Sequence, residues 1–152
     1  MKISLIISMI ISMQILLFLP ARADTVSENK VPACEAYRSE QRKFVAMVCD
    51  EVCPNAPYLC KVAFCSVIIN RIDSGAFPNT AAEVVMTDPI FSKAHNTSFE
   101  ISPSESSLMA YDDAISGFSP YPGLLYYYVT DCANLTLKRR QTLFQIGRYV
   151  FS

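Results

Sequence analysis

The sequence is poor in residues that mark several functional classes. Its 152 residues include no tryptophan and a single histidine, His95, and the formal net charge is only −1. A lone histidine gives little support to a zinc site or to a thiol catalyst, which needs a histidine partner. The one basic run, Lys138-Arg139-Arg140, is too short for a surface that binds nucleic-acid phosphates. We therefore expect no metal site, no cofactor and no nucleic-acid partner.

The long apolar run of the sequence lies at its N-terminus. Lys2 precedes an apolar stretch that ends at Pro20, and Ala21-Arg22-Ala23 follows. A basic start, an apolar centre and an Ala-x-Ala site are typical of a secretory signal peptide. We expect residues 1–23 to be a signal peptide cleaved after Ala23. An uncleaved anchor is the alternative, which the serines within the run weaken.

The remainder of the chain has the size and composition of one exported domain. Cleavage removes 23 of the 152 residues, and the 129 that remain hold 11 basic and 14 acidic residues, a net charge of −3. This length suits a single core, and the phenylalanines, eight of the nine in the chain, argue against disorder. We expect a flexible leader over residues 24–33 and a domain over residues 34–152. The protein would be secreted or periplasmic, with no membrane contact after cleavage.

Cysteine usage also points to an oxidising compartment. The six cysteines are Cys34, Cys49, Cys53, Cys60, Cys65 and Cys132. An even number behind a signal peptide is typical of disulfides, although six cysteines allow 15 connectivities that the sequence cannot separate. We expect a local bridge between Cys53 and Cys60, whereas Cys65 could be a buried thiol in its apolar run. The cysteine spacing is not one that zinc sites commonly use.

The first part of the domain carries helical patterns. Apolar residues recur at spacings of one, three, four and seven over residues 35–52, which predicts an amphipathic helix. A second helix is expected over residues 58–72. Its body, residues 62–69, is apolar almost all round, which predicts a central buried helix. Residues 80–83 form a capping-box pattern and predict a short helix that includes residues 84–86.

The second part is predicted to end in strands. Residues 93–100 are polar and predict a loop. Ser102 is expected to cap a helix that has Pro103 at its first position, runs to Ser116 and ends with Gly117 as its C-cap.

An aromatic run over residues 124–130 predicts a strand, and residues 142–151 predict a closing strand with a bulge at Gly147. The expected class is α+β, with about four helices around the central one and a small antiparallel sheet at the C-terminal end.

Five segments match, in order, the segments of one known family. Residues 62–72 are similar to VAVAAVILNRV, and residues 77–80 to FPNT. Phe91-Ser92 match FS, residues 123–128 resemble GALYFYN, and residues 146–151 resemble IGNHVF. The sequence thus resembles the SleB-type cell-wall hydrolases, which include spore cortex-lytic enzymes.

The resemblance implies a fold, an activity and a catalytic residue. The family has a lysozyme-like α+β fold and cleaves the glycan strands of peptidoglycan, and its spore members act as lytic transglycosylases. Glu51 corresponds to the family's catalytic acid, the first glutamate of GEARGE, if the loop before Val62 is one residue longer. The rest of that segment differs, because Val52-Cys53-Pro54 follows Glu51, and Tyr149 replaces a late histidine of the family.

Glycosidic cleavage is chemistry that one carboxyl group could support here. Hydrolysis usually needs a second carboxylate, whereas a lytic transglycosylase uses the 6-hydroxyl of muramic acid as its nucleophile. At a helix end before the buried helix, burial and the helix dipole would keep the Glu51 carboxyl protonated. The alternative for Glu51 is a solvated residue at a helix end. We expect Asp50 to lie on the surface.

Several polar residues are candidates for substrate binding. Tyr126 and Tyr128 share one face of the expected strand and could form either a sugar-stacking wall or a core face. Ser92 could orient substrate or cap a turn. Asn70 is expected to hold loop backbone, and His95 is expected to be exposed.

Three functions remain open from the sequence. The first is an exported, disulfide-stabilised peptidoglycan glycosidase that uses Glu51 as general acid and then as general base. The second is a catalytically inactive SleB-like domain that binds glycan or a partner protein. The third is a small secreted disulfide protein with no link to cell walls.

Overall fold

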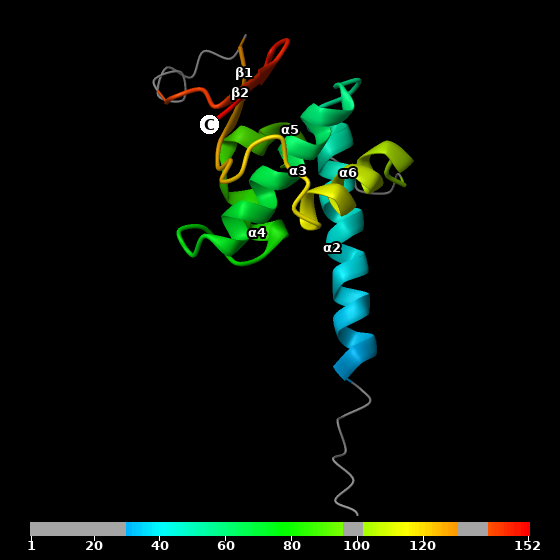
Figure 1. Cartoon of the computed structure of the whole chain (residues 1–152). Helices are drawn as coiled ribbons and strands as arrows, with labels where there is room; N and C mark the ends of the chain where they lie inside the picture. The colour runs from blue at the N-terminus through cyan, green and yellow to red at the C-terminus, as the bar shows by residue number, and fades with distance from the viewer. Residues whose placement is uncertain (1–29, 96–101, 131–139) are drawn as a thin grey trace, which may run out of the picture. The chain divides into compact units, whose positions relative to one another are not determined.

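A computed structural model describes residues 30–95, 102–130 and 140–152 of the chain, and residues 34–152 form one compact unit (Figure 1). The helical elements are α2 (Lys30–Val52), α3 (Tyr58–Asp73), α4 (Ala81–Thr87), the 3₁₀ turn η1 (Pro89–Phe91), α5 (Ser92–His95) and α6 (Glu105–Ile115). The strands are β1 (Tyr127–Val129), β2 (Phe144–Ile146) and β3 (Tyr149–Phe151). The expected α+β class is confirmed.

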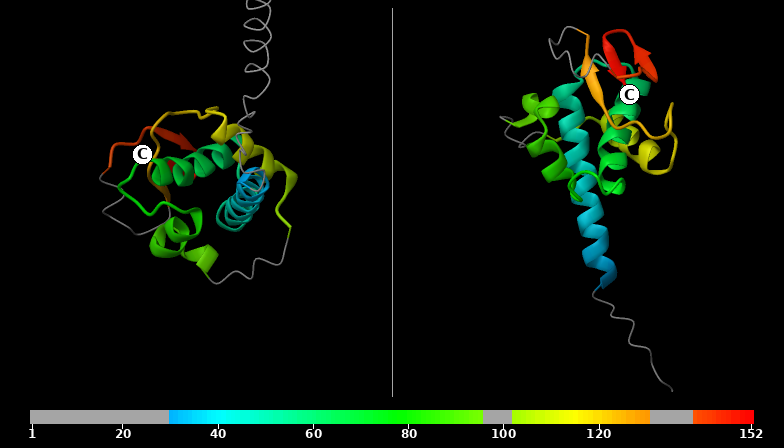
Figure 2. Two further views of the ribbon diagram at one scale, coloured as in Figure 1. Left: turned by 90° about the horizontal axis from the view of Figure 1, so that it is seen from below. Right: turned by 90° about the vertical axis from the view of Figure 1, so that its left-hand side faces the viewer.

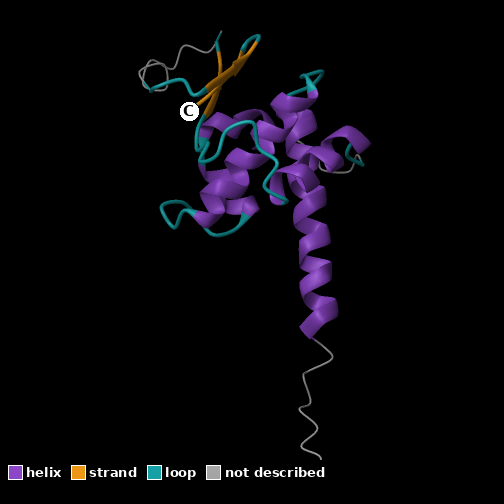
Figure 3. Ribbon diagram, viewed as in Figure 1, coloured by secondary structure: helices purple, strands orange, loops and turns teal. Residues whose placement is uncertain are grey.

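Helix α3 is the central buried helix that the apolar pattern predicts. It lies among the other helices of the unit (Figure 3) and packs against α6 and α4. Residues 60–68 are all buried, Lys61 and Ser66 included. Because this stretch is apolar on nearly every side, it is stable only where other elements surround it and shield its side chains from water.

Helix α2 begins five residues earlier than its apolar pattern indicates. Pro32 lies in its first turn, where a helix tolerates proline because the missing N–H has no partner there. Residues 30–33, expected in the leader, are therefore helical, and the expected signal peptide lies outside the described residues. No helix in the described part of the chain is long and apolar enough to span a membrane.

Two short helices follow α3. Thr80 is the N-cap of α4, since its hydroxyl oxygen accepts a hydrogen bond from the backbone N–H of Glu83 at 3.3 Å, as the capping-box pattern predicts. The loop expected over residues 93–100 is corrected in its first part, because residues 93–95 belong to the single turn of α5. Residues 96–100 lie outside the described part.

Helix α6 begins two residues later than expected. Its N-cap is Ser104 rather than Ser102, and the Ser104 hydroxyl oxygen accepts from the backbone N–H of Ser107 at 3.2 Å. At its other end Ser116 is the C-cap, and Gly117 follows with a φ of +87°. The helix therefore ends one residue before the expected end.

The C-terminal sheet has three strands in the order β1-β3-β2, all antiparallel, gathered at one end of the unit (Figure 2). The single closing strand expected over residues 142–151 is wrong. Ile146 pairs with Tyr149, so Gly147 and Arg148 form a two-residue turn between β2 and β3. Gly147 has a φ of +56°, which a tight hairpin requires, and it is a turn residue rather than a bulge.

Arg71 ties α3 to the segments on either side of it. Its guanidinium is fully buried and donates to the carboxylate of Asp88 and to the carbonyl of Leu125, both at 2.6 Å. The rings of Phe77 and Tyr126 lie 4.6 and 5.4 Å from the guanidinium carbon. One side chain thus joins α3, the segment after α4 and the chain that enters β1.

Candidate active site

Glu51 lies in the last turn of α2, with its side chain exposed. Val52 and Cys53, which follow it, are buried, so the chain turns into the core directly after Glu51. The burial expected for Glu51 is therefore wrong. Within the described residues, no hydrogen bond or ion pair holds its carboxylate, which leaves it free for a ligand.

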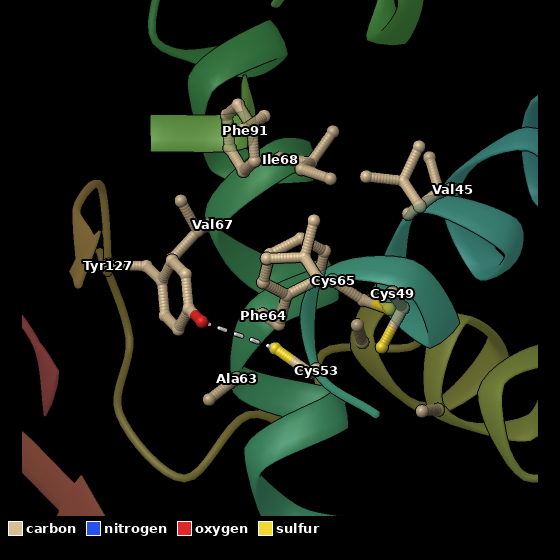
Figure 4. Packing of buried hydrophobic residues seen from close by; sticks show 14 of the residues in the cluster. Val45, Cys49, Cys53, Ala63, Phe64, Cys65, Val67, Ile68, Phe91 and Tyr127 are labelled. Atoms are coloured by element: carbon tan, nitrogen blue, oxygen red, sulfur yellow. Dashed lines mark hydrogen bonds between the residues drawn. The ribbon is translucent and has the colours of Figure 1, made fainter. Parts of the chain in front are cut away.

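The end of α2 is anchored to the sheet next to Glu51. The Cys53 thiol donates to the hydroxyl oxygen of Tyr127 on β1, with 3.6 Å between sulfur and oxygen (Figure 4). The Tyr127 ring packs edge-on against Phe64 of α3, at 5.3 Å between centroids. Burial raises the pKa of the Cys53 thiol far above its ordinary value, so the thiol stays neutral. These contacts fix the chain two residues after Glu51 against β1 and α3.

Asp50, expected on the surface, is instead held in a polar network. Its carboxylate accepts from the backbone N–H of Ser104 at 2.6 Å, the Ser107 hydroxyl at 2.6 Å and the Lys61 ammonium at 3.0 Å. Lys61 and Ser107 are buried. Partial burial opposes ionisation of Asp50, but the hydrogen bonds from Ser107, Ser104 and Lys61 outweigh it and lower its pKa to about 2. Asp50 thus joins α2 to the start of α6.

Asp50→Asn is expected to destabilise the protein in a pH-dependent manner. Because the folded pKa of about 2 lies below the ordinary 3.8, the ionised carboxylate stabilises the fold above about pH 4, and this contribution disappears as the pH falls through about 2. After discounting for solvent screening, we expect a loss of about 1–2 kcal/mol at pH 7. Urea unfolding at pH 7 and about pH 2.5 would show the difference shrink in acid.

The matched control for that measurement is Asp73→Asn, which removes an exposed carboxylate at the end of α3. Its effect is expected to stay within about 0.5 kcal/mol at both pH values. An Asp50→Asn penalty of equal size at both pH values would show that the charge of Asp50 does not stabilise the fold.

The two candidate tyrosines have different surroundings. The Tyr126 ring is half-buried and carries the Arg140 guanidinium at 3.5 Å from its centroid, with the Phe77 ring at 6.1 Å. Tyr128 lies in β1 opposite Val150 and is buried, with 9% of its surface exposed. Tyr126 can therefore offer a ring edge and a cation to a ligand, whereas little of Tyr128 is accessible.

The other candidate residues are placed as follows. Ser92 begins α5, and its side chain lies outside the described part. The Asn70 amide donates to the carbonyl of Leu124 at 2.9 Å, which confirms the expected backbone contact. His95 is half-buried rather than exposed, because its Nε2 lies 2.8 Å from the carbonyl oxygen of Val85.

The predicted bridge between Cys53 and Cys60 is not formed in the structure, where both are free thiols. The Cys53 sulfur contacts the Tyr127 hydroxyl, whereas the Cys60 sulfur faces the carbonyl oxygen of Ile146 at 4.0 Å. Burial raises the pKa of Cys60 to about 11. In the described parts of the chain, no three His, Cys, Asp or Glu side chains are arranged to hold a metal ion.

Two hollows on the described surface lie near α4. One, of about 530 Å³, is lined by Ile72, Gly75, Phe77, Pro78, Asn79, Glu83 and Thr87. The other, of about 320 Å³, is lined by Tyr37, Glu40, Gln41, Phe44, Thr80, Ala81 and Ala82. Neither is lined by Glu51. The first includes Phe77, whose ring contacts that of Tyr126.

The polar network and the buried arginine were not predicted from the sequence. Arg71 is the only charged residue within the apolar segment 62–72, and a charge in such a segment is a signal of a buried ion pair. No comparable signal marks Asp50, because its partners Lys61, Ser104 and Ser107 come from distant positions in the chain.

Comparison with known proteins gives consistent matches. The model of a family described as Cell Wall Hydrolase matches residues 55–152, a range that starts four residues after Glu51. The spore cortex-lytic enzyme of Bacillus cereus is 34% identical over 96 residues, which is 62% of this chain and 37% of that protein. The spore cortex-lytic enzyme of Oceanobacillus iheyensis is 28% identical over 129 residues, 84% of this chain and 47% of that protein. The chain thus spans between about a third and a half of these curated relatives.

Solved structures match over most of the described fold. The catalytic domain of the Bacillus cereus SleB protein aligns with a TM-score of 0.67 and 30% identity, covering 74% of this chain and 89% of that one. The catalytic domain of the germination-specific lytic transglycosylase SleB from Bacillus anthracis aligns with a TM-score of 0.67 and 29% identity, covering 73% and 92%.

Proposed function

The chain belongs to the cell wall hydrolase family, and from this premise we propose that it is an exported enzyme that cleaves the glycan strands of peptidoglycan with Glu51 as its general acid. The observation that carries the proposal is the contrast between two neighbouring carboxylates at the end of α2. Asp50 is bound by Ser104, Ser107 and Lys61, whereas Glu51 is exposed in the last turn of α2 and free to meet a ligand.

One free carboxyl group favours the lytic transglycosylase reaction over hydrolysis. Asp50, adjacent to Glu51, is already occupied by four hydrogen bonds and is a poor nucleophile or base for a second step. In the reaction that we propose, protonated Glu51 gives its proton to the glycosidic oxygen, and the C1–O bond breaks. The Glu51 carboxylate then takes the proton of the muramic 6-hydroxyl as that oxygen bonds to C1, which leaves a 1,6-anhydro end.

Bound substrate would supply the desolvation that the free protein does not give Glu51. A sugar that covers an exposed carboxylate displaces water and favours the uncharged, proton-donating form. The proposal requires no metal and no cofactor.

We propose that Tyr126, Tyr128 and Ser92 bind the glycan, with Tyr126 making the main contact because more of it is accessible. Tyr126→Ala is expected to raise KM for soluble glycan fragments about five- to tenfold with kcat little changed, which corresponds to about 1 kcal/mol of binding at the ring edge. Steady-state kinetics on these fragments provide the measurement.

Tyr121→Ala is the control for Tyr126→Ala, because Tyr121 is an exposed tyrosine that packs against Phe144 instead. Its KM should match that of the unaltered enzyme. If Tyr126→Ala also left KM unchanged, Tyr126 would be a structural residue and the glycan would bind elsewhere.

A second candidate function is a catalytically inactive domain that binds glycan or a partner protein. It is favoured by Val52-Cys53-Pro54, which replaces the rest of the family's GEARGE segment, and by the family match that starts only at residue 55. A turbidity assay on bacterial sacculi separates the two. Clearing of the suspension by the purified chain supports the enzyme, whereas binding to sacculi without clearing supports the inactive domain.

A further inference from the structure

Four buried cysteines gather where α2 meets α3. They are Cys49, Cys53, Cys60 and Cys65, and all are fully buried members of the core cluster. Cys49 lies on α2, and Cys53 directly follows the helix, with its backbone N–H donating to the carbonyl of Cys49 at 2.9 Å. Their contacts differ, and these contacts indicate which pair is placed to form a bond.

The four thiols differ in what they face. The Cys53 sulfur is directed at the hydroxyl of Tyr127, and the Cys60 sulfur at the backbone of β2. Cys49 and Cys65 instead face each other across the two helices (Figure 4). The two thiols are neighbours, since Cys49 raises the pKa of Cys65, and the Cys49 thiol donates to the carbonyl oxygen of Lys61 at 4.0 Å. These contacts therefore favour a bond between Cys49 and Cys65 over a bond that involves Cys53 or Cys60.

We propose that Cys49 of α2 and Cys65 of α3 form a disulfide bond by exchange with a small-molecule or protein disulfide. Cys49 lies two residues before Glu51. One cysteine thiolate attacks the oxidant and displaces a thiol, which gives a mixed disulfide. The second cysteine thiolate then attacks the protein sulfur of that bond and displaces the other thiol. Two cysteines lose two electrons and two protons, and one oxidant disulfide becomes two thiols.

The burial of both sulfurs determines when this reaction takes place. The neighbouring Cys49 thiol and the loss of solvent raise the pKa of the Cys65 thiol well above its ordinary value, so little reactive thiolate exists once the core has formed. The exchange therefore occurs during folding, before α2 closes over α3. After that point the bond is shielded from reductants as well.

Cross-linking at this position would fix the end of the helix that carries Glu51. The bond closes a loop from residue 49 to residue 65 that contains Glu51 and the turn between the helices. It restricts the unfolded chain and is expected to raise the melting temperature by about 10 °C relative to the reduced protein. The inference does not depend on activity, and it holds whether Glu51 is catalytic or not.

Disulfide mapping tests the assignment directly. The full chain is refolded in a mixture of reduced and oxidised glutathione, its helical content is checked by circular dichroism, and remaining thiols are alkylated. Digestion with trypsin and a glutamate-specific protease separates Cys49 in peptide 44–51 from Cys53 and Cys60 in peptide 52–61, and leaves Cys65 in peptide 62–71. We expect mass spectrometry to find peptide 44–51 linked to peptide 62–71, two hydrogens lighter than the sum of both.

Two variants make the outcome decisive. Cys53→Ala should leave the link between peptides 44–51 and 62–71 intact, whereas Cys49→Ala should leave Cys65 alkylated as a free thiol. A link from peptide 62–71 to peptide 52–61, or an alkylated Cys65 in the refolded unaltered chain, would overturn the assignment. Loss of peptidoglycan cleavage alone would bear on the proposed function and not on this bond.

Discussion

Glu51→Gln is expected to reduce the rate of peptidoglycan cleavage by about 100- to 10,000-fold, the range that general acid–base catalysis contributes. Glutamine keeps the size and polarity of the side chain but has no proton to give to the glycosidic oxygen. Because the side chain is exposed and unbound in the described structure, the melting temperature should change by no more than about 2 °C. The rate of sacculus clearing and thermal unfolding together provide the measurement.

Glu35→Gln is the matched control, since Glu35 is an exposed glutamate on the same helix. Its activity should equal that of the unaltered protein. Glu51→Asp should restore only part of the activity, because its shorter side chain places the proton farther from the substrate oxygen. A Glu51→Gln protein with full activity would remove Glu51 from the mechanism.

Arg71→Met is expected to produce the largest loss of stability, about 3 kcal/mol, with a melting temperature lower by about 10 °C. Methionine keeps much of the apolar stem but leaves the Asp88 carboxylate and the Leu125 carbonyl without the cation that both contact at 2.6 Å. Asp88 is partly exposed and regains some hydration, which keeps the loss at the lower end of the range for broken buried pairs. Urea unfolding monitored by circular dichroism gives the value.

Arg42→Met provides the comparison, because Arg42 makes an equally short ion pair on the exposed surface of the protein. Its guanidinium donates to both carboxylate oxygens of Asp112 at 2.6 Å, with the two side chains 37% and 51% exposed. An exposed pair of this kind contributes about 0–1 kcal/mol. If Arg71→Met and Arg42→Met lowered the free energy of unfolding equally, burial would not be what makes the Arg71 contacts stabilising.

Local signals in the sequence were sufficient for much of the helical part. The apolar run over residues 62–69 predicts the central helix, because its side chains need to be buried on all sides. The start of α4 follows from Thr80 and Glu83, whose capping contacts involve residues three apart. Such features need no knowledge of distant segments.

The features that sequence patterns missed depend on distant contacts. Ser102 is the cap that the sequence predicts, but Ser104 takes this position, where its backbone N–H and hydroxyl donate to the distant Asp50. The closing strand divides at Gly147 because β3 pairs on both of its edges, which a linear pattern does not reveal.

The resemblance gives Glu51 as a candidate catalytic residue but does not predict its environment. Glu51 could be aligned with the family's catalytic acid, yet its exposure depends on the way α2 ends against β1 through Cys53 and Tyr127. Likewise, strand alternation places Tyr126 and Tyr128 on one face, but Tyr126 lies before β1 and all three residues of β1 are buried. It does not show that Arg140 covers the Tyr126 ring or that Tyr128 is buried.

The central claim is that this chain cleaves peptidoglycan through Glu51 by the one-carboxylate reaction. Mass spectrometry of the fragments released from purified bacterial sacculi tests it most directly, with the full chain and the Glu51→Gln variant compared side by side. The account predicts muropeptides with 1,6-anhydro ends from the unaltered chain and none from the variant. Release of fragments with reducing ends, or of the same products by both proteins, would contradict it.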